Sequence, residues 1–118
     1  MKIWLDDERN PKEKIIKERY QSEGDETWVK NVEDAIAYIE KGCVTSISLD
    51  HDLGENKKTG YFLAKWIEEK AFLNEIKPFK TRVHSSNPSG AKQMKIALAQ
   101  AEKFWLRYHS DYRRNSND

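Results

Sequence analysis

"CVTSISLDHDLG", residues 43–54, joins an apolar, β-branched run to three adjacent titratable groups. β-branched residues are typical of strands, and the run predicts a buried strand over residues 43–50 in the centre of a sheet. Asp50, His51 and Asp52 stand where this strand should reach the surface. Neighbouring titratable groups repel one another or lose solvation, so a purely structural role explains them poorly. The stretch therefore predicts the central strand and a candidate functional site at its carboxyl end.

Strands and helices are expected to alternate along the whole chain. Short apolar segments predict strands at residues 3–5, 27–31, 43–50 and 81–85. The connection between the first two strands, residues 9–26, has few side chains to bury, so it predicts only a short helix or an irregular segment.

Three helices are expected to begin after N-cap residues, namely Asn31, Thr59 and Asn87. Pro88 would occupy the first turn of the last helix, where a missing N–H costs nothing. The expected inward faces are Val32, Ala35, Ile36 and Ile39 in the first helix, Phe62, Leu63, Trp66 and Ile67 in the second, and Met94, Ala97, Leu98, Ala101 and Trp105 in the third.

This alternation predicts an α/β fold with a parallel sheet of about four strands, covered on both faces by helices. The length of 118 residues corresponds to one domain. We expect the domain to span residues 1–106 and to be followed by a polar C-terminal tail over residues 107–118.

The bulk composition excludes several function classes. Of the residues, 37% are hydrophobic and 35% charged, and the net charge is only +1, so no broad nucleic-acid-binding surface is expected. The single cysteine, Cys43, has no partner for an internal disulfide and is expected to be a small core residue. The N-terminus becomes acidic after four residues, unlike a signal peptide or a membrane span, so we expect a cytoplasmic protein without membrane contact.

Polar side chains follow three of the predicted strands. In open α/β sheets, ligands bind outside the carboxyl ends of the strands, so these groups should meet at one edge of the sheet. They are Asp6 and Asp7 after the first strand, Asp50, His51 and Asp52 after the third, and His84, Ser85, Ser86 and Asn87 after the fourth.

The carboxylates of this set suit a hard cation. Asp6, Asp7 and Asp50 could supply oxygen ligands to Mg²⁺, with Asp52 as a further candidate. The alternative is that Asp6 and Asp7 only cap the turn that follows them.

The two imidazoles suit proton transfer near neutral pH. His51 and His84 could act as general base and general acid on opposite sides of a phosphodiester, and Asp50 or Asp52 could orient a ring through its other nitrogen. The alternative is that one histidine is exposed at the surface, whereas the other is buried in the core with its ring nitrogens hydrogen-bonded to the protein.

The segment "HSSNPSG", residues 84–90, opens the last predicted helix. A helix N-terminus attracts anions through its free N–H groups and its dipole, so Ser85, Ser86 and Asn87 are candidate phosphate contacts. The alternative is an ordinary N-cap, for which Asn87 suffices.

Five blocks of the sequence resemble, in order, those of the cyclic-phosphate-processing receiver-like domains, a branch of the response-regulator receiver fold. The blocks are "KIWLDDERNP", "VKNVEDAIAYIEKG", "SISLDHDLG", "TGYFLAKWIEE" and "RVHSSNPSG". The similarity extends from Met1 to about Glu102, and "LDHDLG" together with "HSSNP" is its most specific part. The segment from Lys12 to Glu26 looks longer than the connection usual in this family.

The resemblance implies a receiver-like (flavodoxin-like) three-layer sandwich with a shortened set of strands. It implies a phosphoesterase-like activity on a cyclic phosphate, such as an RNA 2′,3′-cyclic end or a cyclic nucleotide. Carried onto this chain, it implies His51 and His84 as the acid–base pair, with an acidic pocket of Asp6, Asp7 and Asp50. Ser85 and Asn87 would contact the phosphate.

Two other functions stay open at this point. The domain could be a non-catalytic signalling module that binds a phosphorylated ligand or accepts phosphate on Asp50. The last expected helix is not followed by a counterpart of the lysine that contacts the phosphoryl group in ordinary receivers. The domain could also be a phosphatase of linear monoesters, with the pair Asp50 and Asp52 as nucleophile and neighbouring acid.

Overall fold

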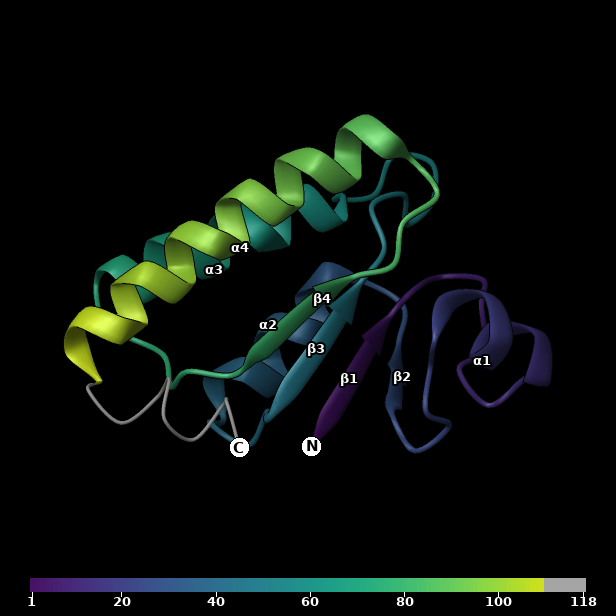
Figure 1. Cartoon of the computed structure of the whole chain (residues 1–118), viewed down its shortest axis with the longest axis horizontal. Helices are drawn as coiled ribbons and strands as arrows, with labels where there is room; N and C mark the ends of the chain where they lie inside the picture. Colours follow the sequence, from purple (N-terminus) through teal and green to yellow (C-terminus); the bar gives the residue numbers. More distant parts are fainter. Residues whose placement is uncertain (110–118) are drawn as a thin grey trace.

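A computed structural model describes residues 1–109 of the chain and contains eight elements within that range. The elements are β1 (Lys2–Leu5), α1 (Lys14–Tyr20), β2 (Thr27–Val29), α2 (Val32–Glu40), β3 (Ser46–Leu49), α3 (Gly60–Phe72), β4 (Lys80–Val83) and α4 (Pro88–Tyr108). Figure 1 shows their alternation from the purple N-terminus to the yellow end of α4.

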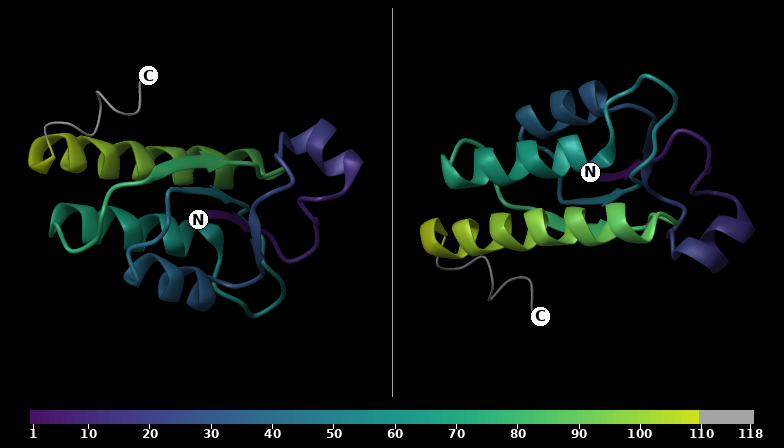
Figure 2. Two further views of the ribbon diagram at one scale, coloured as in Figure 1. Left: turned by 90° about the horizontal axis from the view of Figure 1, so that it is seen from below. Right: turned by 90° about the horizontal axis from the view of Figure 1, so that it is seen from above.

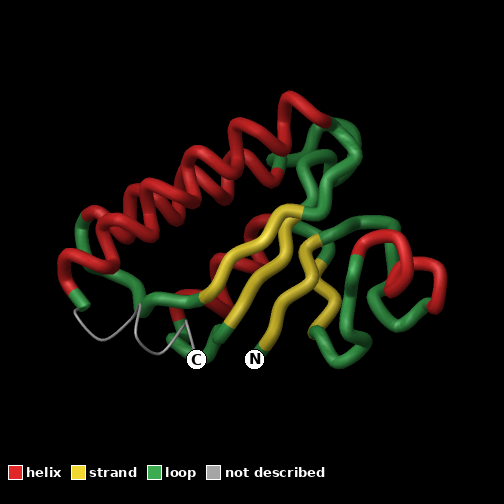
Figure 3. The backbone as a smooth tube through the Cα atoms, viewed as in Figure 1, coloured by secondary structure: helices red, strands yellow, loops and turns green. Residues whose placement is uncertain are grey.

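The four strands form one parallel sheet in the order β2-β1-β3-β4. Leu5 at the end of β1 lies beside the last residues of both neighbouring strands, Val29 and Leu49, and Leu49 lies beside Val83. The strands therefore end at the same level, and the loops that leave them lie at one edge of the sheet (Figure 3).

Successive side chains of each strand point to opposite faces of the sheet. Ile3 and Leu5 of β1 and Ile47 and Leu49 of β3 are buried in one core together with α2, α3 and α4. Figure 2 shows these three helices side by side, with α1 apart from them. Trp4 has no exposed surface and lies on the opposite face, toward α1.

This arrangement confirms the predicted receiver-like α/β sandwich with a four-stranded parallel sheet. The three expected N-caps are also confirmed, because each side chain accepts a hydrogen bond from a backbone N–H of the first helical turn. The pairs are Asn31 with Asp34, Thr59 with Phe62, and Asn87 with Gly90.

Two expected core residues are instead exposed. Phe62 is 42% exposed, because the buried side of α3 is formed by the line that includes Leu63 and Ile67. Cys43 is exposed as well, since it lies before β3, which begins only at Ser46.

The connection after β1 contains a short helix, α1, which is the first of the two alternatives expected for it. The ends of other elements differ from the predicted boundaries. α4 includes Arg107 and Tyr108, which we expected in the tail; residues 110–118 of that tail lie outside the described residues. Within the part of the chain that the structure describes, no helix is long and apolar enough to cross a membrane.

Gly60 brings the start of α3 against the carboxyl end of β3. Its N–H donates to the carbonyl of His51 at 2.8 Å. A Cβ at this position would overlap the carbonyl oxygen of Asp50 and would lie 2.9 Å from Sδ of Met94. The absence of a side chain therefore allows the first residue of α3 to pack against the backbone of Asp50 and His51 at the candidate site.

We expect Gly60→Ala to lower the free energy of unfolding by at least about 2 kcal/mol, because backbone atoms cannot move aside as a flexible side chain can. Urea denaturation followed by circular dichroism measures the loss. Lys65→Ala, at an exposed position of the same helix, is the control and should change stability little. A fully stable Gly60→Ala variant would contradict this packing.

Candidate active site

The backbone ladder of the sheet continues for one residue beyond three of the strand ends. The N–H of Asp6 donates to Val29, that of Asp50 to Leu5, and that of His84 to Leu49, at 2.9–3.0 Å. These three polar residues therefore lie in a row across neighbouring strands. All three are buried, with 0%, 5% and 6% of their surface exposed, respectively.

Asp6 is bound through both carboxylate oxygens. Oδ1 accepts from the backbone N–H groups of Glu8 and Arg9, at 2.9 and 3.0 Å, and Oδ2 faces Nε2 of His84 at 3.1 Å. Burial by itself raises the pKa of Asp6, but the hydrogen bonds from His84 and from the two amides outweigh burial and hold this pKa below its usual range. Asp6 is therefore ionised at neutral pH.

His84 is enclosed by aromatic rings and polar partners. Its ring stacks on Trp4 at 3.7 Å between centroids, and Tyr20 approaches edge-on at 6.3 Å. Nδ1 lies 2.7 Å from Oγ of Ser48. Burial lowers the pKa of His84 in spite of the opposing charge of Asp6, so the ring is neutral near pH 7. Since Asp6 carries no proton, Nε2–H donates to it and the Ser48 hydroxyl donates to Nδ1.

This environment corrects the expectation that His84 exchanges a proton with a ligand. Only 1% of its side-chain surface is exposed, and both ring nitrogens already have partners. The sequence placed His84 correctly at the sheet edge. It did not reveal that Trp4 and Tyr20 would cover the ring, and the alternative of a satisfied core histidine holds.

Asp50 is the second buried carboxylate of the row. Its Oδ1 accepts from the backbone N–H of His51 at 2.8 Å, and its Oδ2 lies 3.3 Å from Nη1 of Arg9. Burial raises the pKa of Asp50 to about 6, and the negative charge of Asp6 contributes in the same direction.

Arg9 belongs to the candidate site, although it is not among the site residues expected from the sequence. Its Nη1 lies 3.3 Å from Oδ2 of both Asp6 and Asp50, its Nη2 lies 3.4 Å from Oγ of Ser86, and Cζ stands 4.4 Å above the ring of Tyr20. The available signal was an arginine three residues after an acidic strand end. A single arginine in a polar loop is too common to predict this bridge.

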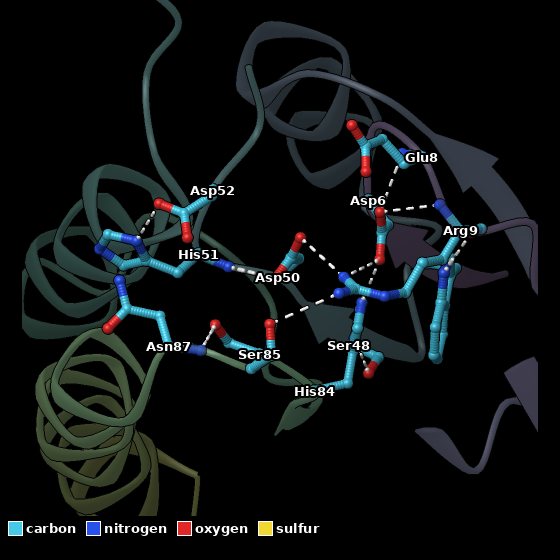
Figure 4. A network of polar contacts seen from close by, with 12 residues as sticks. Asp6, Glu8, Arg9, Ser48, Asp50, His51, Asp52, His84, Ser85 and Asn87 are labelled. Carbon is cyan, nitrogen blue, oxygen red and sulfur yellow. Dashed lines mark hydrogen bonds and ion pairs between the residues drawn. The ribbon is translucent and has the colours of Figure 1, made fainter. Parts of the chain in front are cut away.

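His51 lies on the other side of Asp50, away from His84 (Figure 4). Its Nδ1 is 2.9 Å from Oδ1 of Asp52, a contact of the kind expected of an orienting carboxylate, and its side chain is 17% exposed. The ring rests on the first turn of α4, where a Cβ at Gly90 would come within 2.7 Å of Cγ of His51. No described residue forms a hydrogen bond with Nε2, which lies 3.0 Å from the position that this Cβ would take.

The polar side chains at the N-terminus of α4 have two different roles. Oδ1 of Asn87 accepts from Gly90 at 3.0 Å, and Oγ of Ser85 accepts from the N–H of Asn87 at 3.1 Å. Asn87 and Ser85 therefore stabilise the turn, as the N-cap alternative expected. Ser86 instead faces Arg9 and lines the cleft.

The polar groups surround an open cleft of about 390 Å³. It is lined by Asp7, Glu8, Arg9, Asp50, Asp52, Gly54 and Ser86. Carboxylate oxygens of Asp6, Asp7 and Asp50 lie within 4.8 Å of one another, and oxygen donors of this kind suit Mg²⁺. The residues therefore fit a divalent cation, although the guanidinium of Arg9 already contacts two of the three carboxylates. Thr59 serves as the N-cap of α3.

The raised pKa of Asp50 predicts a pH dependence of stability in metal-free protein. The folded state keeps this carboxyl protonated up to about pH 6, whereas the unfolded state ionises near 3.8, so ionisation costs stability as the pH rises through this interval. Asp50→Asn removes the cost and should be more stable than the wild type at pH 7.5 by up to about 3 kcal/mol.

Urea denaturation in EDTA between pH 4 and 8 measures this difference, which should be small at pH 4 and grow toward pH 7. Asp52→Asn, whose side chain is 70% exposed, is the control and should show no such growth. A stability difference that is independent of pH would contradict the burial argument for Asp50.

Comparison with known proteins identifies the family. The sequence model of the family named cyclic-phosphate processing receiver domain matches residues 1–100 of this chain. This range contains all four strands of the sheet and every residue that lines the cleft. Neither the curated proteins nor the solved structures include a significant match. The chain belongs to the family of cyclic-phosphate processing receiver domains.

Proposed function

We propose that this domain hydrolyses a cyclic phosphodiester in the cleft between Arg9 and the N-terminus of α4, with His51 as the proton-transfer residue. The observation that carries the proposal is the setting of His51. Its Nδ1 is held by a carboxylate, no described residue forms a hydrogen bond with its Nε2, and it stands beside the start of a 21-residue helix. The candidate substrates are an RNA 2′,3′-cyclic end and a cyclic nucleotide.

The proposed reaction adds water across one P–O bond. Nε2 of His51 accepts a proton from water as the oxygen–phosphorus bond forms. The leaving oxygen takes a proton from solvent water in the open cleft as the ring P–O bond breaks, and the imidazolium then releases its proton to solvent, so no other reagent is consumed. Asp52 holds Nδ1–H and stabilises the transient positive charge of the ring.

Charge on the phosphoryl group needs positive partners. Arg9 and the N–H groups at the start of α4 can supply them, together with the hydroxyl of Ser86. Ser85 and Asn87 support this end of the helix rather than meeting the phosphate directly. His84 is proposed as a positioning residue, because it contacts only Asp6 and groups of the protein interior.

Mg²⁺ is the proposed cofactor. Asp6, Asp7 and Asp50 would hold it, and a bound cation would neutralise negative charge on the phosphoryl oxygens. In this arrangement Asp50 serves as a metal ligand, as in the acidic pocket expected from the sequence, and takes no part in the catalytic proton transfer.

The two alternatives have weaker support. Asp50 is 5% exposed and both of its oxygens accept hydrogen bonds, which is a poor setting for a phosphate acceptor or a nucleophile. Asp52 is paired with His51 and not with Asp50.

We expect His51→Gln to lower turnover at least about 100-fold, the usual contribution of a positioned general base, while the fold is retained. The assay uses cyclic mononucleotides, cyclic oligonucleotides and RNA with a cyclic end, each with and without Mg²⁺. His109→Gln is the matched control, since His109 bonds to Asn74 outside the cleft. Full activity of His51→Gln would exclude this mechanism.

A further inference from the structure

We propose that Arg9 is an exchangeable counter-ion: it neutralises Asp6 and Asp50 in metal-free protein and turns to a phosphoryl oxygen when a divalent cation takes its place. This inference rests on the proposed function, because it assigns a mode of regulation to the same site. Its consequence is that the site binds a phosphate tightly only after it has bound a metal.

Arg9 contacts the very oxygens that a cation would need. Oδ1 of Asp6 already accepts two backbone N–H groups, and Oδ1 of Asp50 accepts the N–H of His51. Oδ2 of Asp50 has no described donor other than Arg9, and Oδ2 of Asp6 accepts from His84 and Arg9 only. Nη1 of Arg9 lies 3.3 Å from both Oδ2 atoms. Mg²⁺ binds oxygen at 2.0–2.1 Å, so the ion and the guanidinium compete for the same two atoms.

The contacts of Arg9 are long for their type. Charge-assisted N–H···O bonds are usually 2.7–2.9 Å, whereas both carboxylate contacts are 3.3 Å and the contact with Ser86 is 3.4 Å. The guanidinium thus balances the local charge without an optimal bidentate pair. A divalent ion with short bonds to the same oxygens has the stronger interaction.

The backbone of Arg9 is anchored, so the exchange needs only a side-chain movement. Its N–H donates to Asp6, and its carbonyl accepts the indole N–H of Trp4 at 2.9 Å. The guanidinium already lies over the ring of Tyr20 and reaches Ser86 at the start of α4. A turn toward that helix end keeps the aromatic contact and brings the positive charge to the position where an anion is attracted.

The exchange couples two binding events. Removing the guanidinium from the carboxylates costs free energy in the absence of metal, and that cost opposes phosphate binding. Metal removes the cost, so metal and phosphate should each raise the affinity for the other by the same factor. The expected factor lies in the usual range for such coupling, about 5- to 150-fold.

The first test is titration calorimetry with Mg²⁺ on the full chain. Arg9→Gln should bind Mg²⁺ at least about fivefold more tightly than the wild type, because the competing cation is gone. Arg19→Gln is the matched control, since it makes the same charge change at an exposed position of α1. An Arg9→Gln affinity equal to or below that of the wild type overturns the proposal, as does a lack of Mg²⁺ binding in both proteins.

The second test titrates inorganic phosphate with and without saturating Mg²⁺. Mg²⁺ should raise the phosphate affinity of the wild type at least about fivefold and should raise that of Arg9→Gln much less. Equal enhancement in both proteins would mean that the metal alone binds the phosphate and would overturn the role of Arg9. These binding results are independent of the His51→Gln turnover assay, so either proposal can fail while the other stands.

Discussion

The register of the parallel sheet is the constraint on which the site depends. Each of β1, β3 and β4 contributes one further backbone hydrogen bond after its last strand residue, and that next residue is Asp6, Asp50 or His84. Peptide groups therefore set the spacing of the polar row before any side chain interacts. A slip of one residue would turn all three side chains toward the other face of the sheet.

Burial of this row places two carboxyl groups close together and away from water, and the surrounding residues affect the ionisation of each one differently. Asp6 remains ionised because backbone amides and a neutral His84 donate to it, whereas Asp50 has only one amide and a long contact to Arg9. The two carboxylates consequently differ in pKa although they occupy equivalent positions on neighbouring strands. Among the described residues, Arg9 is the positive charge that contacts both, and this explains why a half-buried loop residue is central to the site.

Much of this architecture could be predicted from local patterns. The apolar segments, the caps at Asn31, Thr59 and Asn87, and the polar residues after the strands depend on short-range chemistry, and the structure confirms them. Predictions about which side of an element is buried were less secure. Phe62 lies next to the buried Leu63 but points outward, because the packing of α3 on α4 and not the helical pattern alone decides the buried side.

The sequence by itself determined that strands alternate with helices and that acidic and imidazole groups meet at one edge of the sheet, since a parallel sheet admits no other placement. Only the tertiary structure decided what each group faces. His84 and His51 follow neighbouring strands in similar polar surroundings, yet one stacks on Trp4 in the interior and the other rests on Gly90 beside the cleft. Side-chain partners come from segments distant in the chain, and a one-dimensional pattern does not record which of those segments cover a residue and which leave it accessible.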